Sequence, residues 1–187
     1  MTYLIVGLGN PGDKYIRSRH NAGFLLLDYI YGKEDWNKCT TCNLLYKNTE
    51  DALCIKPLTM MNLSGRAVLC RKEKHDIDIQ NIIVVHDDVD LRFGEFKISK
   101  ASSDGGHNGI KSIIESLGTK EFIRVRIGIA PTTLFGLKKK PRDTSAFVLK
   151  DFTNKQLRAS EDMKDDIASI LRMIQSDGVE RAMNRFN

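Results

Sequence analysis

One histidine of the chain lies in a setting that could support acid-base chemistry. His20 and Asn21 follow closely on the segment 7–12, which reads Gly-Leu-Gly-Asn-Pro-Gly and includes the carboxamide of Asn10. Imidazole is the side chain best suited to accept a proton near neutral pH. The apolar run 3–6 is typical of a buried strand, and the glycines after it permit a sharp turn and close approach of a ligand. We therefore expect a functional site where the first strand ends.

A carboxylate that could orient this histidine is Asp87. The apolar run 82–85 predicts a second buried strand, and His86, Asp87 and Asp88 follow at its expected end. A carboxylate that accepts a hydrogen bond from one imidazole nitrogen fixes the tautomer and stabilises the imidazolium that forms. The alternative is that Asp87 only caps or solvates the end of the strand.

Two further polar clusters occur where elements are expected to begin or end. They are the segment 60–65, Met-Met-Asn-Leu-Ser-Gly, and the segment 105–109, Gly-Gly-His-Asn-Gly. Ligands of open α/β sheets bind in a crevice at the carboxyl ends of the strands, so all these clusters can converge on one cleft. Asn10, Asn62 and Asn108 could present carboxamides there, although a single Asn in such a place often only caps a turn or helix. Three of them beside a histidine suggest recognition of a peptide or a ribose.

Two other site types fit the sequence less well. The segment 7–12 matches the dinucleotide pattern Gly-x-Gly-x-x-Gly, but Pro11 precedes its third glycine and Asp28 lies within an expected helix rather than at a strand end. A covalent nucleophile is unsupported, because neither Ser64 nor Cys70 has a base nearby in sequence and no nucleophile elbow occurs.

A metal centre remains an alternative. His86, Asp87, Asp88 and His107 could be arranged as ligands of a hydrolytic metal ion. The spacing argues against it, because no H-x-H or H-E-x-x-H pattern occurs and adjacent aspartates on a strand point in different directions. We expect neither a metal nor another cofactor.

The pattern of apolar residues predicts alternating strands and helices. Buried strand runs that alternate with amphipathic helices favour a three-layer α/β/α fold, with a central mixed twisted sheet, in a single domain over residues 1–187. Beyond the two buried strands, the expected elements are a hairpin at 43–49 and 52–56, strands at 95–99 and 122–129, helices at 24–30, 61–74 and 110–117 with Gly118 as the left-handed cap, one helix from Thr153 or Asn154 to Ile174, and a short helix after Gly178.

The charge of the chain suggests an anionic partner. The formal net charge is +5, and basic residues are concentrated between positions 97 and 142. Alternation along the expected strand places Arg124 and Arg126 on one face. Segment 131–145, with two prolines, a glycine and a run of lysines, predicts a mobile basic loop, and segment 100–106 predicts a flexible polar loop.

The compartment is expected to be the cytoplasm. The chain has no signal-peptide pattern at its start and no apolar run long enough for a membrane span. Cys39, Cys42, Cys54 and Cys70 are therefore expected to be reduced structural thiols. The pair Cys39 and Cys42 has C-x-x-C spacing, but it lacks the strand-to-helix setting of a redox motif, and no second pair completes a zinc site.

The motifs together resemble those of bacterial-type peptidyl-tRNA hydrolases over nearly the whole chain. Ser18 stands where the family commonly has threonine, and the segment 97–105 and the loop before Phe147 look longer than usual. Four ordered blocks carry the resemblance: Gly7-Leu8-Gly9-Asn10-Pro11-Gly12 with Tyr15, Ser18-Arg19-His20-Asn21 and Gly23; Thr59 with Met61-Asn62-Leu63-Ser64-Gly65; His86-Asp87-Asp88 with Asp90; and Gly105-Gly106-His107-Asn108-Gly109 with Lys111-Ser112-Ile113.

The resemblance implies a cofactor-free hydrolase of the ester between a peptide and the terminal ribose of tRNA. His20 would be the general base, Asp87 would keep it basic, and Asn10 would help distinguish blocked from free aminoacyl groups. The expected partner is peptidyl-tRNA, bound by a cytoplasmic monomer; a metal-dependent esterase or nuclease and a non-catalytic tRNA-binding module are the alternatives. Further contacts are implied for the substrate at Tyr15, Met60, Asn62 and Asn108, and for acceptor-stem phosphates at Lys97 and Arg126.

Overall fold

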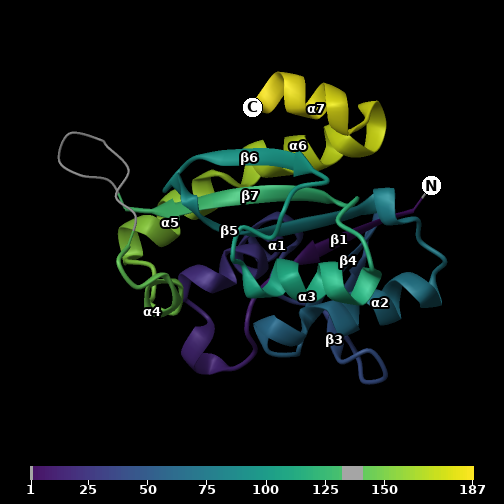
Figure 1. Ribbon diagram of the computed structural model, residues 1–187, viewed down its shortest axis with the longest axis horizontal. Coiled ribbons are helices and arrows are strands. Elements are labelled where there is room, and N and C mark those ends of the chain that lie inside the picture. The colour runs from purple at the N-terminus through teal and green to yellow at the C-terminus, as the bar shows by residue number, and fades with distance from the viewer. Residues whose placement is uncertain (1, 132–140) are drawn as a thin grey trace.

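The centre of the protein is a seven-stranded mixed sheet in the computed structural model, which describes residues 2–131 and 141–187 (Figure 1). The strand order is β2-β3-β4-β1-β5-β7-β6. The four inner strands β4, β1, β5 and β7 are parallel, and β2, β3 and β6 pair antiparallel at the two edges. The strands are β1 Tyr3–Gly7, β2 Asn37–Cys39, β3 Leu44–Asn48, β4 Ala52–Pro57, β5 Ile82–Arg92, β6 Phe96–Lys100 and β7 Ile123–Ala130.

Helices cover both faces of the sheet (Figure 1). None of the helices in the described residues is long and apolar enough to cross a membrane. The α-helices are α1 Ala22–Tyr31, α2 Ser64–Lys74, α3 Asn108–Leu117, α4 Thr144–Val148, α5 Asn154–Asp162, α6 Lys164–Asp177 and α7 Val179–Phe186, and the single-turn 3-10 helices are η1 Asp13–Tyr15, η2 Arg19–Asn21, η3 Met61–Leu63 and η4 Ile79–Asn81.

Two hydrophobic cores follow from the alternation of side chains along the strands. In β5, Ile83 and Val85 join a cluster with residues of α1 and α6, whereas Ile82 and Val84 join a cluster with residues of α2 and α3. Because both faces of the parallel strands are covered, these strands read as unbroken apolar runs. The three-layer fold expected from the sequence is confirmed.

Strand β5 is longer than the sequence predicted, and this difference shapes the site. His86, Asp87 and Asp88 lie within the strand rather than after it, because β7 continues to pair with them. The neighbour on the other side, β1, ends at Gly7 opposite Val85. Beyond Val85, β5 therefore has no β1 residue beside it, and space is left there for other segments to approach.

Most other expected elements are present, but the sequence pattern does not predict the short edge strand β2, and two further elements differ. Thr153 begins α5 with a capping box, and Gly118 ends α3 in the left-handed conformation, both as expected. The expected long helix is divided at Met163 into α5 and α6. Helix α4 begins at Thr144, inside the last two positions of the expected basic loop 131–145, and residues 132–140 of that loop lie outside the described part of the chain.

Two of the four cysteines are paired, so the expectation of free thiols is wrong for them. Cys42, in the turn after β2, forms a disulfide with Cys70 of α2, with Cα atoms 5.6 Å apart and a sequence separation of 28. The packing of the β2–β3 turn against α2 brings them together, which spacing along the chain does not reveal. Cys39 and Cys54 are free.

Candidate active site

The four polar clusters of the sequence converge on one cleft of about 640 Å³. Two expected site residues, Tyr15 on η1 and Lys97 on β6, are not among the residues that line it. The other expected residues line the cleft together: Asn10, His20, Met60, Asn62, Asp87, Asn108 and Arg126.

The turn after β1 is held in place by Asn21. Its side-chain oxygen accepts a hydrogen bond from the backbone N–H of Asn10 at 2.9 Å, and its Nδ2 donates to the carbonyl of Asn10 at 3.0 Å. The Ser18 hydroxyl donates to the same oxygen at 3.2 Å. Asn21 is thus buried as a clamp that fixes the segment carrying Asn10 beside His20.

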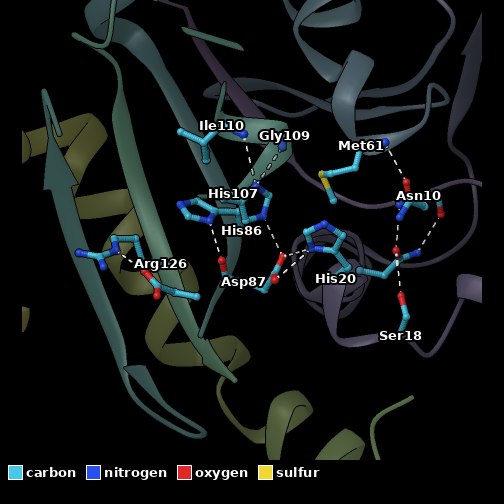
Figure 2. A network of polar contacts seen from close by, with 12 residues as sticks. Asn10, Ser18, His20, Met61, His86, Asp87, His107, Gly109, Ile110 and Arg126 are labelled. Atoms are coloured by element: carbon cyan, nitrogen blue, oxygen red, sulfur yellow. Dashed lines mark hydrogen bonds and ion pairs between the residues drawn. The ribbon is translucent and has the colours of Figure 1, made fainter. Parts of the chain in front are cut away.

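His20 and Asp87 are in direct contact, although 67 positions separate them (Figure 2). Nδ1 of His20 lies 2.9 Å and 3.0 Å from the two carboxylate oxygens. An ionised carboxylate only accepts hydrogen bonds, so the proton of the neutral imidazole lies on Nδ1. The lone pair is therefore on Nε2, at the opposite side of a ring that lines the cleft.

The surroundings make this imidazole more basic. Burial by itself disfavours protonated His20, but the charge of Asp87 and its hydrogen bond outweigh burial and raise the pKa of His20 above its ordinary value. Burial also disfavours the charged form of Asp87 and by itself would raise its pKa, but His20 and His107 hold this pKa well below its usual range. Asp87 is therefore ionised at any pH at which the protein works.

His107 is a second imidazole on the same carboxylate. Its Nε2 lies 3.0 Å from Oδ1 of Asp87, while its Nδ1 accepts hydrogen bonds from the backbone N–H groups of Gly109 and Ile110 at 3.1 and 3.3 Å (Figure 2). From the sequence alone, the role suggested for the His107 side chain is that of a metal ligand. Its position directly before the apolar period of α3 is the sequence signal for the cap that it forms.

His86 is turned away from this hydrogen-bond system. Its Nδ1 donates to the carbonyl of Asp87 at 2.7 Å, and its Nε2 is buried with no partner in the described residues. Burial and the proximity of His107 lower the pKa of His86 well below its usual value. The ring packs edge-on against His107, with centroids 4.7 Å apart. His86 thus remains neutral and its Nε2 is inaccessible.

The carboxamide of Asn10 has one orientation. Its Oδ1 accepts a hydrogen bond from the backbone N–H of Met61 at 2.8 Å, which leaves Nδ2 as the group that it can offer to a ligand in the cleft. Asn62 of η3 and Asn108 at the start of α3 are both exposed and line the same cleft, and Met60 is 44% exposed there.

Arg124 and Arg126 point to the same side of β7, as expected, but they differ in their contacts. Arg124 is buried and donates to the carbonyl of Ser103 at 2.8 Å, so it anchors the loop before α3. Arg126 donates through Nε to Asp88 at 2.5 Å, which partly balances its charge. Lys97 is exposed and lies opposite Arg126 across the β6–β7 pair.

Comparisons with known proteins place this chain in a family. Residues 4–187 match the family model described as peptidyl-tRNA hydrolase. The chain belongs to the peptidyl-tRNA hydrolase family. It is 42% identical over 194 residues to the peptidyl-tRNA hydrolase of Thermodesulfovibrio yellowstonii and 39% identical over 189 residues to that of Pseudothermotoga lettingae, covering 98% of this chain in each case and 98% and 96% of the respective relatives.

A solved structure agrees with this family assignment. The crystal structure of peptidyl-tRNA hydrolase from Acinetobacter baumannii superposes with a TM-score of 0.85 at 28% identity, over 100% of this chain and 94% of that one. The mixed sheet and the helical layers described above are thus those of a peptidyl-tRNA hydrolase.

In this member of the peptidyl-tRNA hydrolase family, the cluster around Asp87 does not suit a metal ion. His20, Asp87 and His107 could each offer an atom within 4.8 Å of the others. However, two backbone N–H groups donate to Nδ1 of His107, so its Nε2 carries the proton and has no lone pair for a metal. Asp88, a ligand of the metal alternative, is bonded to Arg126 instead.

Proposed function

We propose that this chain hydrolyses the ester bond between a peptide and the terminal ribose of tRNA, with His20 as the general base and water as the nucleophile. The contact between Nδ1 of His20 and Asp87 carries the proposal, because it leaves Nε2 as a basic lone pair in a cleft. Membership of the peptidyl-tRNA hydrolase family supports the choice of substrate.

The reaction begins with transfer of a water proton to Nε2 of His20 as the oxygen attacks the ester carbonyl. The imidazolium that forms is stabilised by Asp87, which stays ionised and keeps the ring oriented. The ribose oxygen then leaves and recovers the proton from His20. General-base assistance of this kind contributes about 10² to 10⁴-fold in rate, and the ester needs no further activation by a metal.

The carboxamides in the cleft provide polar contacts for the peptide. Nδ2 of Asn10 is a donor, so it suits the carbonyl of an N-acyl group and repels the ammonium of a free aminoacyl ester. Asn62 and Asn108 can donate to the oxyanion or hold the attacking water. Met60 offers an exposed apolar surface to the substrate, and Tyr15 on η1 would contact it from outside the cleft lining.

The tRNA is bound through phosphate contacts by Lys97 and Arg126, which are cross-strand neighbours beside the cleft. Such contacts position a nucleic acid without reading its sequence. We also propose that the protein acts as a monomer. Because peptidyl-tRNA arises during translation, we place the reaction in the cytoplasm.

The decisive experiment compares N-acetylated aminoacyl-tRNA with the same tRNA carrying a free amine. The blocked ester should be cleaved and the free one largely spared, and His20→Ala should reduce turnover at least ~10²-fold because the base is lost. His75→Ala, which removes an exposed histidine on the turn after α2, is the matched control and should keep normal turnover. Near-normal cleavage by His20→Ala, loss of cleavage after chelation of metals, or tRNA binding without any cleavage would contradict the proposal.

A further inference from the structure

The two nitrogens of His107 have fixed and opposite roles. The backbone N–H groups of Gly109 and Ile110 donate to Nδ1, so this nitrogen carries no proton. Nε2 must then carry it, and it lies 3.0 Å from Oδ1 of Asp87. The start of α3 thus determines the tautomer of a ring that donates to the partner of His20.

The carboxylate of Asp87 accepts hydrogen bonds from two imidazoles. Oδ1 receives hydrogen bonds from both Nδ1 of His20 and Nε2 of His107, at 2.9 and 3.0 Å. The carboxylate is 2% exposed, so water does not compete with these donors. In such a buried site each added donor stabilises the anion and lowers its attraction for the other donor.

We propose that His107 is a positioning residue that sets the basicity of His20 by sharing the carboxylate of Asp87. Because the same ring caps α3, the position of the first turn of α3 also affects the pair formed by His20 and Asp87. The inference rests on the proposed function of His20 as the base. It assigns His107 a task apart from contact with substrate. It also connects Asn108, the first residue of α3, to the same hydrogen-bond system.

The other titratable or charged side chains near the pair leave this role to His107. Those facing the cluster are His86 on β5 and Arg124 on β7. His86 has already donated its only proton to the carbonyl of Asp87. Arg124 donates to the carbonyl of Ser103, in the loop before α3. In the described residues, only His20 and His107 make side-chain hydrogen bonds to the Asp87 carboxylate.

Two substitutions separate the cap from the donor. In His107→Asn, the amide oxygen can take the place of Nδ1 and accept from the N–H groups of α3, but the shorter side chain does not reach Asp87. In His107→Gln, the longer amide can place an N–H near the position of Nε2 and donate to Asp87, while the cap is lost. The two variants therefore serve as controls for each other.

The expected result is a difference in the pH profile. In His107→Asn, Asp87 should bind protonated His20 more strongly, so the acid limb of kcat/KM for N-acetylated aminoacyl-tRNA should move up by about one pH unit with little change in Tm. In His107→Gln, the acid limb should stay at the wild-type pH, while Tm falls by several degrees because the cap is lost.

A titration of the His20 imidazole by NMR, in the wild type and in His107→Asn, measures the same shift without substrate. It separates failure of this inference from failure of the proposed function. If the wild type does not cleave the ester but the His20 pKa still moves in the variant, only the proposed function is wrong. An unmoved His20 pKa in His107→Asn, or an equal upward shift in His107→Gln, would overturn the role of His107.

Discussion

Three histidines lie around Asp87, and their hydrogen bonds give each a different capacity for chemistry. His86 has donated its proton to a carbonyl and its remaining nitrogen is buried. His107 has its lone pair occupied by the first turn of α3. Only His20 combines a proton bound to the carboxylate with a lone pair in the cleft. The distribution of protons therefore supports His20, and neither of the other two histidines, as the base of the proposed reaction.

The pH dependence of activity should follow the raised pKa of His20. The neutral form is the base, so kcat/KM should rise with pH through a value above 6.5 in the wild type. Asp87→Asn removes the charge that raises this pKa. The acid limb of the kcat/KM profile should therefore move to lower pH, and the plateau of kcat/KM above it should fall by at least ~10²-fold. Asp166→Asn, at an exposed position of helix α6, is the charge-matched control. A limb that stays in place in Asp87→Asn would contradict the role of Asp87.

The same contact affects stability, with a sign that follows from linkage. Because folding raises the pKa of His20, the stabilisation by this pair is fully present below the unfolded pKa near 6.5 and is lost as pH rises through the folded value. The depressed pKa of Asp87 contributes stability above about pH 4, which is lost as pH falls below that. The pair thus stabilises the fold most in mildly acidic solution, whereas the proposed reaction requires the pH at which His20 is neutral.

At the scale of elements, the cleft exists because neighbouring strands end at different heights. β1 ends at Gly7, while β5 continues past Val85 to Arg92 alongside β7. The segment with η2 fills the space beside the extended part of β5 and brings His20 to Asp87. On the opposite face α2 and α3 approach closely, since a Cβ on Gly65 would lie 2.1 Å from the carbonyl of Ser112. Tight packing there holds the segments of Asn62 and Asn108 beside each other.

The disulfide between Cys42 and Cys70 should contribute to stability by restricting the unfolded chain. A loop of 28 residues corresponds to about 3.5 kcal/mol in the chain-entropy model. Reduction, or the substitution Cys70→Ala, should therefore lower Tm by about 10 °C. Cys39→Ser, which alters a free thiol in the same region, should leave Tm sensitive to the reductant. A wild-type Tm that is equal with and without dithiothreitol would show that the bond does not stabilise the fold.

At the scale of the whole molecule, the chain combines a net positive charge with a cleft whose own charges are largely paired. The formal net charge is +5, yet Asp87 is bonded to two imidazoles and Asp88 to Arg126. Exposed Lys97 lies near this cleft without lining it. We therefore expect the surface beside the cleft to attract the polyanion, and the carboxamides within the cleft to recognise the peptide.

Binding of tRNA should accordingly depend on salt, and Lys97 should account for one phosphate contact. Lys97→Ala is expected to raise KM with little change in kcat, and to reduce the slope of log affinity against log salt by about one. Lys74→Ala removes an equal charge from the C-terminal end of α2 and should leave KM and the salt slope unchanged. Equal effects of the two substitutions would indicate general attraction instead of a contact at Lys97.

Sequence patterns determined the layers of the fold and most of the cleft residues, because both depend on the order of residues along the chain. Apolar runs specify strands buried on both faces, and helical spacing specifies the faces that cover them. The tertiary structure decided the extension of β5, the disulfide at Cys42, the pairing of Arg126 with Asp88 and the contact of His107 with Asp87. Each depends on partners that are distant in sequence, because the atoms that folding brings together determine which imidazole nitrogen carries a proton and whether a thiol forms a disulfide.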